Sequence, residues 1–265
     1  MNGGPLVDRY DLVIFDLDGV VYIGSEPVPG AADAIRWLRE RGTPIAFVTN
    51  NASRSAADVA GLLTSFGVAA EPADVTTSAQ ATATVLAGRL EPHSPVLVVG
   101  APALEAEIAA VGLEPVRQAD AGPVAVVQGY GPTVGWPELA EACVAVRRGA
   151  WWIATNSDRT LPSPKGPLPG NGALVAALAT ALGRDPDLVV GKPAPTLMAE
   201  AARRHGARHP LMVGDRLDTD IEGAHRAGMD SLLVLTGVSR REELDSAPPE
   251  QKPTYVAADL SALIS

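Results

Sequence analysis

Short apolar runs alternate with segments of helical periodicity along nearly the whole chain, and this alternation constrains the fold more than any other feature. The apolar runs predict strands at residues 12–15, 45–48, 96–99, 124–127, 151–154, 188–190, 211–213 and 231–235. Helices are predicted between them at residues 31–41, 54–66, 77–90, 103–111, 136–147, 172–182, 195–205 and 220–227. Such βα alternation is typical of parallel sheets with helices on their faces. The sequence therefore predicts an α/β protein with a doubly wound parallel sheet.

Two proline-containing joints interrupt the alternation, at residues 91–95 and 185–187. The chain has 265 residues, slightly more than the size at which a single core usually stops growing. We therefore expect two domains, the second an α/β unit inserted into the first. The expected boundaries give a core of residues 1–90 and 187–265 and an inserted domain of residues 91–186.

The composition excludes several classes of partner. A formal net charge of −10 argues against a nucleic-acid backbone or an anionic membrane surface as the main partner. Cys143 is the only cysteine, which agrees with a reducing compartment. Residues 1–9 lack the apolar core of a signal peptide, and no apolar run approaches the roughly 20 residues that span a bilayer. We expect a cytoplasmic protein.

Two carboxylates, Asp16 and Asp18, follow the first apolar run, one residue apart and directly before Gly19. Alternation along a strand would place both on the same side, and open α/β sheets bind ligands beyond the carboxyl ends of their strands. Like charges so close repel and are costly to desolvate, so we expect a divalent cation that prefers oxygen ligands between them. The same short pattern also occurs in plain turns.

Polar residues follow two further predicted strands. Thr49, Asn50 and Asn51 come before a helix that Ser53 could cap, and a hydroxyl with free backbone N–H groups at a helix start suits a phosphate. A simple capped turn explains the same residues. Lys192 follows the strand predicted at 188–190 and precedes a proline, which favours an extended backbone there and would direct its ammonium group into the crevice.

A third group of acids follows the strand predicted at 211–213. We interpret Asp215, at the end of that strand, as a metal ligand. Asp220 lies at the start of the next helix and is expected to orient the site from behind, by holding Lys192 or a metal-bound water. Asp218 is most simply a helix cap or a surface acid.

In this order, the motifs resemble those of the haloacid dehalogenase superfamily, and most closely its NagD-like branch of small-molecule phosphatases. The resemblance is carried by residues 15–20, by residues 48–51, by Gly191-Lys192-Pro193 and by residues 214–220, and it extends over essentially the whole chain. It implies a Rossmann-like core, an inserted α/β cap between the second and third motifs, and Mg²⁺ as cofactor.

The resemblance also implies roles for individual residues. Asp16 matches the nucleophile that forms an aspartyl-phosphate, and Asp18 matches the general acid and base. Thr49, Asn50 and Lys192 match phosphate binders, with Asn51 beside them in the same motif. Mg²⁺ would be held by the carboxylates of Asp16 and Asp215 and by the backbone carbonyl of Asp18.

A loop in the inserted domain is the expected determinant of substrate selectivity. Arg159, Thr160 and Leu161 lie in a stretch rich in turn formers after the strand predicted at 151–154. In the family that this chain resembles, the corresponding cap loop contacts the leaving group. A surface loop without function would have the same composition.

The resemblance and the residues together predict a Mg²⁺-dependent phosphoric monoester hydrolase that acts on a small phosphorylated metabolite. Glycerol 3-phosphate or 2-phosphoglycolate is favoured, because residues 159–161 offer a compact loop without an aromatic platform for a base. Nucleotide monophosphates, pyridoxal phosphate and sugar phosphates are the alternatives within this class. A phospho-accepting signalling switch is the alternative of a different class, and a homodimer formed through the cap is left open.

Overall fold

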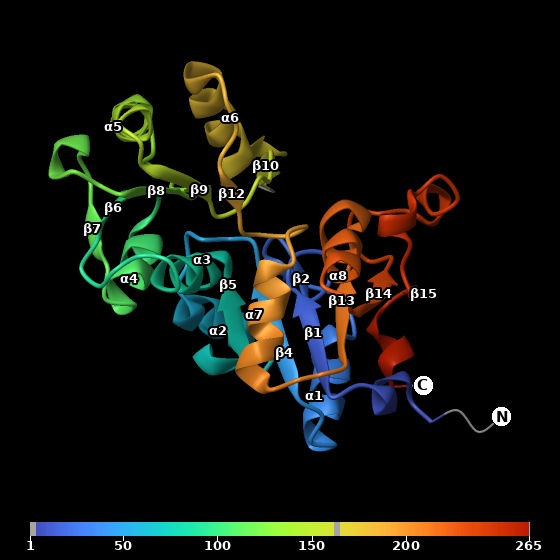
Figure 1. The fold of residues 1–265 in the computed structure, drawn as a ribbon. Coiled ribbons are helices and arrows are strands. Elements are labelled where there is room, and N and C mark those ends of the chain that lie inside the picture. The colour runs from blue at the N-terminus through green and yellow to red at the C-terminus, as the bar shows by residue number, and fades with distance from the viewer. Residues whose placement is uncertain (1–3, 162–164, 265) are drawn as a thin grey trace. The chain divides into compact units, whose positions relative to one another are not determined.

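The computed structural model describes residues 4–161 and 165–264, and these form two compact units. The first, the core unit, contains the residues up to Thr49, residues 56–76 and the chain from Lys192 onward. The second, the cap unit, contains residues 50–55 and 77–191. Figure 1 shows the elements of each unit in chain order. The chain enters the cap unit twice, at residues 50–55 and again at residues 77–191, and returns to the core unit after each.

The core unit is built on a six-stranded sheet in the order β15-β14-β13-β1-β4-β5. Every neighbouring pair from β15 to β4 is parallel. The strands are β1 (Leu12–Asp16), β4 (Ile45–Thr49), β5 (Val75–Thr77), β13 (Pro210–Gly214), β14 (Asp230–Val234) and β15 (Tyr255–Ala257). The chain builds outward from β1 in one direction and then resumes at β13 on its other side. The connections that leave β1 and β13 therefore run in opposite directions, and doubly wound sheets bind ligands in the crevice at such a switch point.

The helices of the core unit pack over an apolar centre. They are α1 (Ala31–Glu40), α2 (Ala56–Ser65), α7 (Thr196–His205) and α8 (Glu222–Arg226), and a π-helical turn, Leu217–Ile221, precedes α8. All five residues of β1 are buried, and Phe15 lies beside Phe47 of β4 in the register. Leu38 of α1 and Leu63 of α2 belong to the same buried cluster. A strand buried along its whole length is what a parallel sheet covered on both faces requires.

A small hairpin follows β1 directly. Its strands are β2 (Tyr22–Ile23) and β3 (Glu26–Pro27), and they pair antiparallel. Gly24 at its turn has a φ of 61°, a left-handed conformation that favours glycine. Asp18 bridges to Tyr22, so the residues after β1 fold back toward its end.

The cap unit contains a five-stranded parallel sheet in the order β12-β9-β8-β6-β7. Its strands are β6 (Pro95–Val99), β7 (Glu114–Val116), β8 (Ala125–Gln128), β9 (Trp151–Ala154) and β12 (Leu188–Val189). Its helices are α3 (Ser78–Ala87), α4 (Pro102–Ala110), α5 (Trp136–Arg147) and α6 (Asn171–Leu182). A short hairpin of β10 (Thr160–Leu161) and β11 (Leu168–Pro169) precedes α6. Trp152 is fully buried at the centre of this unit.

The fold class agrees with the prediction, whereas the expected boundaries at 90/91 and 186/187 differ from the observed units. The segment 77–90, expected in the core, lies in the cap unit, where α3 packs against α4. Residues 188 and 189, also expected in the core, form β12, in which Leu188 pairs with Ile153 and Val189 with Ala154 of β9. Strands β5, β7 and β15 and both hairpins were not predicted.

The β10–β11 hairpin spans residues 160–169, and residues 162–164 lie outside the described residues. Among the described residues, no helix combines the length and apolar character needed to cross a membrane.

Candidate active site

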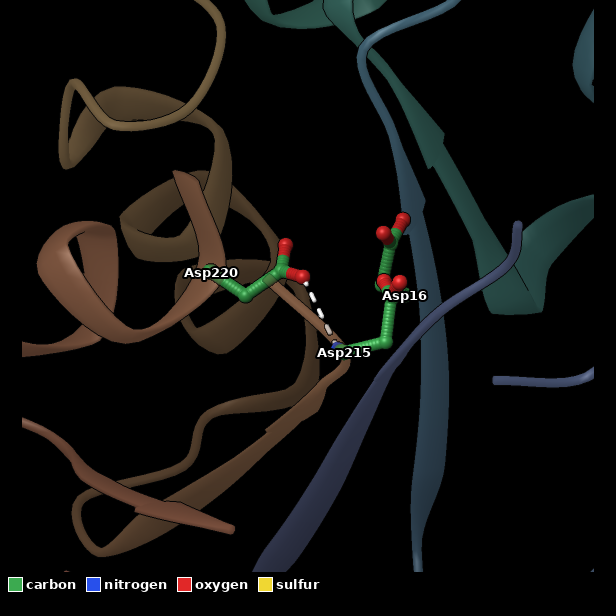
Figure 2. A group of neighbouring side chains, drawn as sticks. All are labelled: Asp16, Asp215 and Asp220. Atoms are coloured by element: carbon green, nitrogen blue, oxygen red, sulfur yellow. Dashed lines mark hydrogen bonds between the residues drawn. The ribbon is translucent and has the colours of Figure 1, made fainter. Parts of the chain in front are cut away.

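Acids from neighbouring strands meet at the switch point of the core sheet. Asp16 is the last residue of β1, and Asp215 follows β13 directly. Asp220 comes from the π-helical turn after β13. One carboxylate oxygen from each of the three lies within 4.8 Å of the others, and all three residues are buried (Figure 2). The parallel pairing of β1 with β13 explains this meeting, because both strands end at the same edge.

Lys192 neutralises part of this cluster. Its Nζ lies 2.7 Å from Asp16 Oδ1 and 2.7 Å from Asp220 Oδ1. The residue is only 2% exposed, and burial alone would lower its pKa, but the charges of Asp16 and Asp220 outweigh burial and raise it. Lys192 is therefore a fixed ammonium group between two carboxylates.

Asp220 has hydrogen-bond partners at both carboxylate oxygens. Oδ1 accepts from Lys192, and Oδ2 accepts the backbone N–H groups of Asp215 and Arg216, each at 3.1 Å. A Cβ on Gly214 would overlap the Asp220 side chain, so only glycine permits this approach. The expected contact between Asp220 and Lys192 is present. Both carboxylate oxygens of Asp220 are therefore occupied by hydrogen bonds to neighbouring groups.

Asp215 differs from Asp220 at one oxygen. Its Oδ2 accepts the backbone N–H of Val238 at 2.7 Å, whereas its buried Oδ1 has no hydrogen-bond partner among the described residues. Burial, followed by the charges of Asp220 and Asp16, raises the pKa of Asp215 to about 8. The pKa of Asp220 rises to about 6, mainly through burial and then through the charge of Asp16.

These features fit a divalent cation. A buried carboxylate oxygen without a partner is costly in a folded protein, and a cluster of carboxylates with one lysine carries excess negative charge. Hard divalent cations such as Mg²⁺ bind through one or two carboxylates and retain several waters. One carboxylate oxygen each of Asp16, Asp215 and Asp220 lies close enough to share such an ion, although Asp220 already bonds Lys192 and two backbone N–H groups.

Asp18 lies beyond the end of β1, where the β2–β3 hairpin folds back, and it is partly buried. Burial raises its pKa, although hydrogen bonds from the backbone N–H groups of Gly24 and Gly19 act in the opposite direction. A carboxyl group that keeps its proton to higher pH is suited to general acid catalysis.

The residues after β4 have more contacts than the sequence indicated. Thr49 ends β4 and is buried, as is Asn50, which begins the part assigned to the cap unit. The amide Nδ2 of Asn50 donates to Asp158, at 3.1 Å to Oδ1 and 3.2 Å to Oδ2. Its backbone carbonyl accepts from Ser78 Oγ and Asn156 Nδ2, each at 2.6 Å. Asn50 is thus held by three residues of the cap unit.

Asn51 is exposed and forms a local turn. Its Oδ1 accepts from both the backbone N–H and the hydroxyl of Ser53, at 2.8 and 2.7 Å. Helix α2 begins only at Ala56, so Ser53 belongs to this turn and does not cap the helix as expected.

The cap loop predicted to determine selectivity forms one strand of a hairpin. Arg159 and Thr160 are exposed and Leu161 is partly buried, with Thr160 opposite Pro169 in the register. Asp158, directly before them, was not singled out from the sequence. It is 108 positions from Asn50, and a hydrogen bond over such a separation leaves no local signal.

Comparisons with known proteins agree with this geometry. A family model described as haloacid dehalogenase-like hydrolase matches residues 13–114, and a HAD-hydrolase-like model matches residues 189–263. A D-glycerol 3-phosphate phosphatase of Mycobacterium tuberculosis is 52% identical over 97% of this chain and 72% of the relative. A 5′-nucleotidase of Bacillus subtilis is 38% identical over 96% of this chain and 98% of the relative.

Solved structures give the same result. A glycerol phosphate phosphatase from Mycobacterium tuberculosis in complex with magnesium has a TM-score of 0.96 and 51% identity, covering 99% of this chain and 79% of that one. A p-nitrophenyl phosphatase from Archaeoglobus fulgidus has a TM-score of 0.88 and 34% identity, covering 97% and 98%. With acids at the ends of β1 and β13 and these matches over nearly its whole length, the chain belongs to the haloacid dehalogenase-like hydrolase family.

Proposed function

We propose that the chain is a Mg²⁺-dependent phosphatase that hydrolyses a small phosphorylated metabolite through an aspartyl-phosphate. The observation that carries this proposal is the cluster at the sheet switch point. There Asp16 contacts a buried ammonium group, and Asp215 keeps one oxygen without a hydrogen-bond partner. The named relatives, which are phosphatases or nucleotidases, support the same chemistry.

The proposed reaction has two displacements at phosphorus. A carboxylate oxygen of Asp16 attacks phosphorus, the bond from phosphorus to the ester oxygen breaks, and Asp18 gives its proton to the leaving oxygen. Asp18 then takes a proton from water, which attacks the aspartyl-phosphate, releases phosphate and restores Asp16. When bound, Mg²⁺ supplies charge neutralisation for the phosphoryl oxygens.

Other residues bind and orient the phosphate in this proposal. Lys192 and the hydroxyl of Thr49 donate hydrogen bonds to the phosphoryl oxygens. Lys192 stays charged at all working pH values, because the two neighbouring carboxylates raise its pKa. Asn50 is a further phosphate ligand, with Asn51 beside it in the turn. The Mg²⁺ ligands are the carboxylates of Asp16 and Asp215 and the backbone carbonyl of Asp18, with Asp220 behind them.

The favoured substrate is glycerol 3-phosphate, the compound in the name of the relative at 52% identity, with 2-phosphoglycolate next. Arg159, Thr160 and Leu161 are the proposed selectivity residues. Relatives at 35–38% identity are named a 5′-nucleotidase and acid sugar phosphatases, which keeps nucleotide and sugar phosphates as alternatives. We further propose a cytoplasmic enzyme, in keeping with its single cysteine.

The test is a panel of phosphate esters with detection of inorganic phosphate, run with Mg²⁺ and with excess chelator. Glycerol 3-phosphate, 2-phosphoglycolate, a nucleoside monophosphate, pyridoxal phosphate and a sugar phosphate are compared by kcat/KM. We expect steady turnover that chelation abolishes and Mg²⁺ restores. Asp16→Asn should remain folded and lose nearly all turnover, because an amide cannot attack phosphorus. Full activity in chelator, or one phosphorylation without turnover, would contradict the proposal, and the second result would favour a signalling switch.

Helix α5 of the cap unit carries exposed apolar side chains. Trp136 at the start of α5 is 80% exposed and Val144 on the same helix is 40% exposed. We propose a homodimer through this face. Sedimentation velocity should give a dimer for the wild type and a monomer for Trp136→Glu, and a monomeric wild type would refute the proposal.

A further inference from the structure

The loop after β14, residues 236–239, contacts Asp215 through its backbone. The N–H of Val238 donates to Asp215 Oδ2 at 2.7 Å, and the N–H of Ser239 donates to the Asp215 carbonyl at 3.1 Å. Val238 is 61% exposed, and it contacts Asp215 through its backbone N–H. None of these residues carries a charge, and they were not among the predicted site residues.

Two glycines approach the Asp215 carboxylate from different loops. A Cβ built on either Gly19 or Gly237 would overlap the carboxylate atoms. The two loops are tied to each other, because the hydroxyl of Thr236 donates to the Gly19 carbonyl at 2.6 Å. The hydroxyl of Ser239 also accepts the N–H of Leu217 at 3.1 Å, which fixes the loop to the π-helical turn.

The two carboxylate oxygens of Asp215 differ in their hydrogen bonding. Oδ2 has a donor at 2.7 Å, while Oδ1 is buried without a hydrogen-bond partner among the described residues. A carboxylate free to rotate could offer either oxygen, or both, to a cation. A carboxylate that glycine backbones from two loops approach closely, and that is hydrogen-bonded at one oxygen, offers only the other oxygen.

We propose that Gly19, Thr236, Gly237, Val238 and Ser239 form an Asp215 collar, a positioning device that commits Oδ2 and presents Oδ1 to the divalent cation. This inference rests on the proposed function, because it concerns the cation of the same site. Groups that orient a metal ligand typically affect metal affinity by about 10–100-fold when they are removed. The collar therefore acts on cation affinity through Asp215, without touching the substrate.

Two matched pairs of variants test the collar. Val238→Pro removes the N–H that holds Oδ2, and Val238→Ala keeps it while shortening an exposed side chain. Thr236→Val removes the hydroxyl that ties the two loops, and Thr236→Ser keeps it. Mg²⁺ dissociation constants are measured by isothermal titration calorimetry, with thermal unfolding in chelator as the check on folding.

We expect Val238→Pro and Thr236→Val to weaken Mg²⁺ binding by roughly tenfold or more, and their partners Val238→Ala and Thr236→Ser to bind within about twofold of the wild type. At saturating Mg²⁺, the KM for the phosphate ester should stay near the wild-type value. If Val238→Pro fails to fold, the Thr236 pair decides the question.

Equal Mg²⁺ affinity in the members of a folded pair would overturn the collar while leaving the proposed phosphatase intact. Conversely, suppose that the wild type binds Mg²⁺ more tightly than Val238→Pro and Thr236→Val, yet hydrolyses no phosphate ester. That result would support the collar and refute the proposed function.

Discussion

Replacing Lys192 with methionine should destabilise the core unit strongly and in a pH-dependent way. Methionine has nearly the same length and no charge, so the change removes the ammonium group and leaves the cavity filled. Asp16 and Asp220 would then be buried with no cation between them, although each stands 2.7 Å from Nζ in the wild type. We therefore expect a loss of stability that comes from uncompensated charge.

The magnitude follows from two opposing terms. At an effective dielectric constant of about 20, a unit ion pair at the observed 2.7 Å gains about 6 kcal/mol, and Lys192 makes two such pairs. Desolvation of the three ions cancels most of this gain, and removing one partner of a buried pair typically costs about 3–5 kcal/mol. Acid reduces that cost, because the pKa of Asp220 is raised to about 6 and its protonated carboxyl no longer needs a cation.

The assay is urea unfolding in chelator at about pH 8 and pH 5, with hydrogen exchange of peptides from β1 and β13 to follow the core unit separately, since two compact units need not unfold together. The control is Lys192→Met combined with Asp220→Asn, which removes one stranded charge and should recover part of the loss. A loss below about 1 kcal/mol, within the range of an exposed ion pair, would refute the reasoning. So would an equal loss at both pH values.

Three further outcomes are expected. Asp18→Asn should spare the first turnover of an aryl phosphate, whose leaving group needs no proton, but then stall with phosphate trapped on Asp16; rapid-quench kinetics without a burst would contradict the acid–base role. In chelator, the stability of the wild type should fall as pH rises from about 5 to 8. The pKa values of Asp215 (about 8) and Asp220 (about 6) are raised in the folded state, which therefore holds more protons than the unfolded state over this range. Calorimetric scans at several pH values measure this, and a stability that rises with pH would contradict it. Asp158→Ala removes a hydrogen bond of about 1 kcal/mol that orients Asn50, and should raise the inhibition constant of inorganic phosphate by roughly fivefold. Asp158→Asn keeps an acceptor and should keep most of the affinity. Equal inhibition constants for the two variants would exclude this orienting role.

Much of the core unit could be predicted from sequence, because parallel strands end at one edge and their last residues meet there. The positions of Asp16, Thr49 and Asp215 at strand ends follow from apolar runs that stop at a polar residue. Of the two partners expected for Asp220, Lys192 or a metal-bound water, the structure shows the contact with Lys192.

The sheet that β12 joins, the contacts of the 236–239 loop and the bond from Asn50 to Asp158 could not be predicted from the types of the residues involved. β12 is two residues long, and nothing in Leu188-Val189 says which sheet it joins. The 236–239 loop acts through backbone N–H groups, which every residue other than proline possesses. The bond from Asn50 to Asp158 depends on how two distant loops are folded, which periodicity does not describe.

The arrangement around Lys192 has a consequence for the order in which ligands enter the site. Three carboxylates face one ammonium group, and that ammonium already contacts Asp16 and Asp220. A doubly charged phosphate ester approaching this cluster alone meets repulsion, whereas a divalent cation approaching alone meets attraction. Ordered addition follows, with the cation first and the ester second.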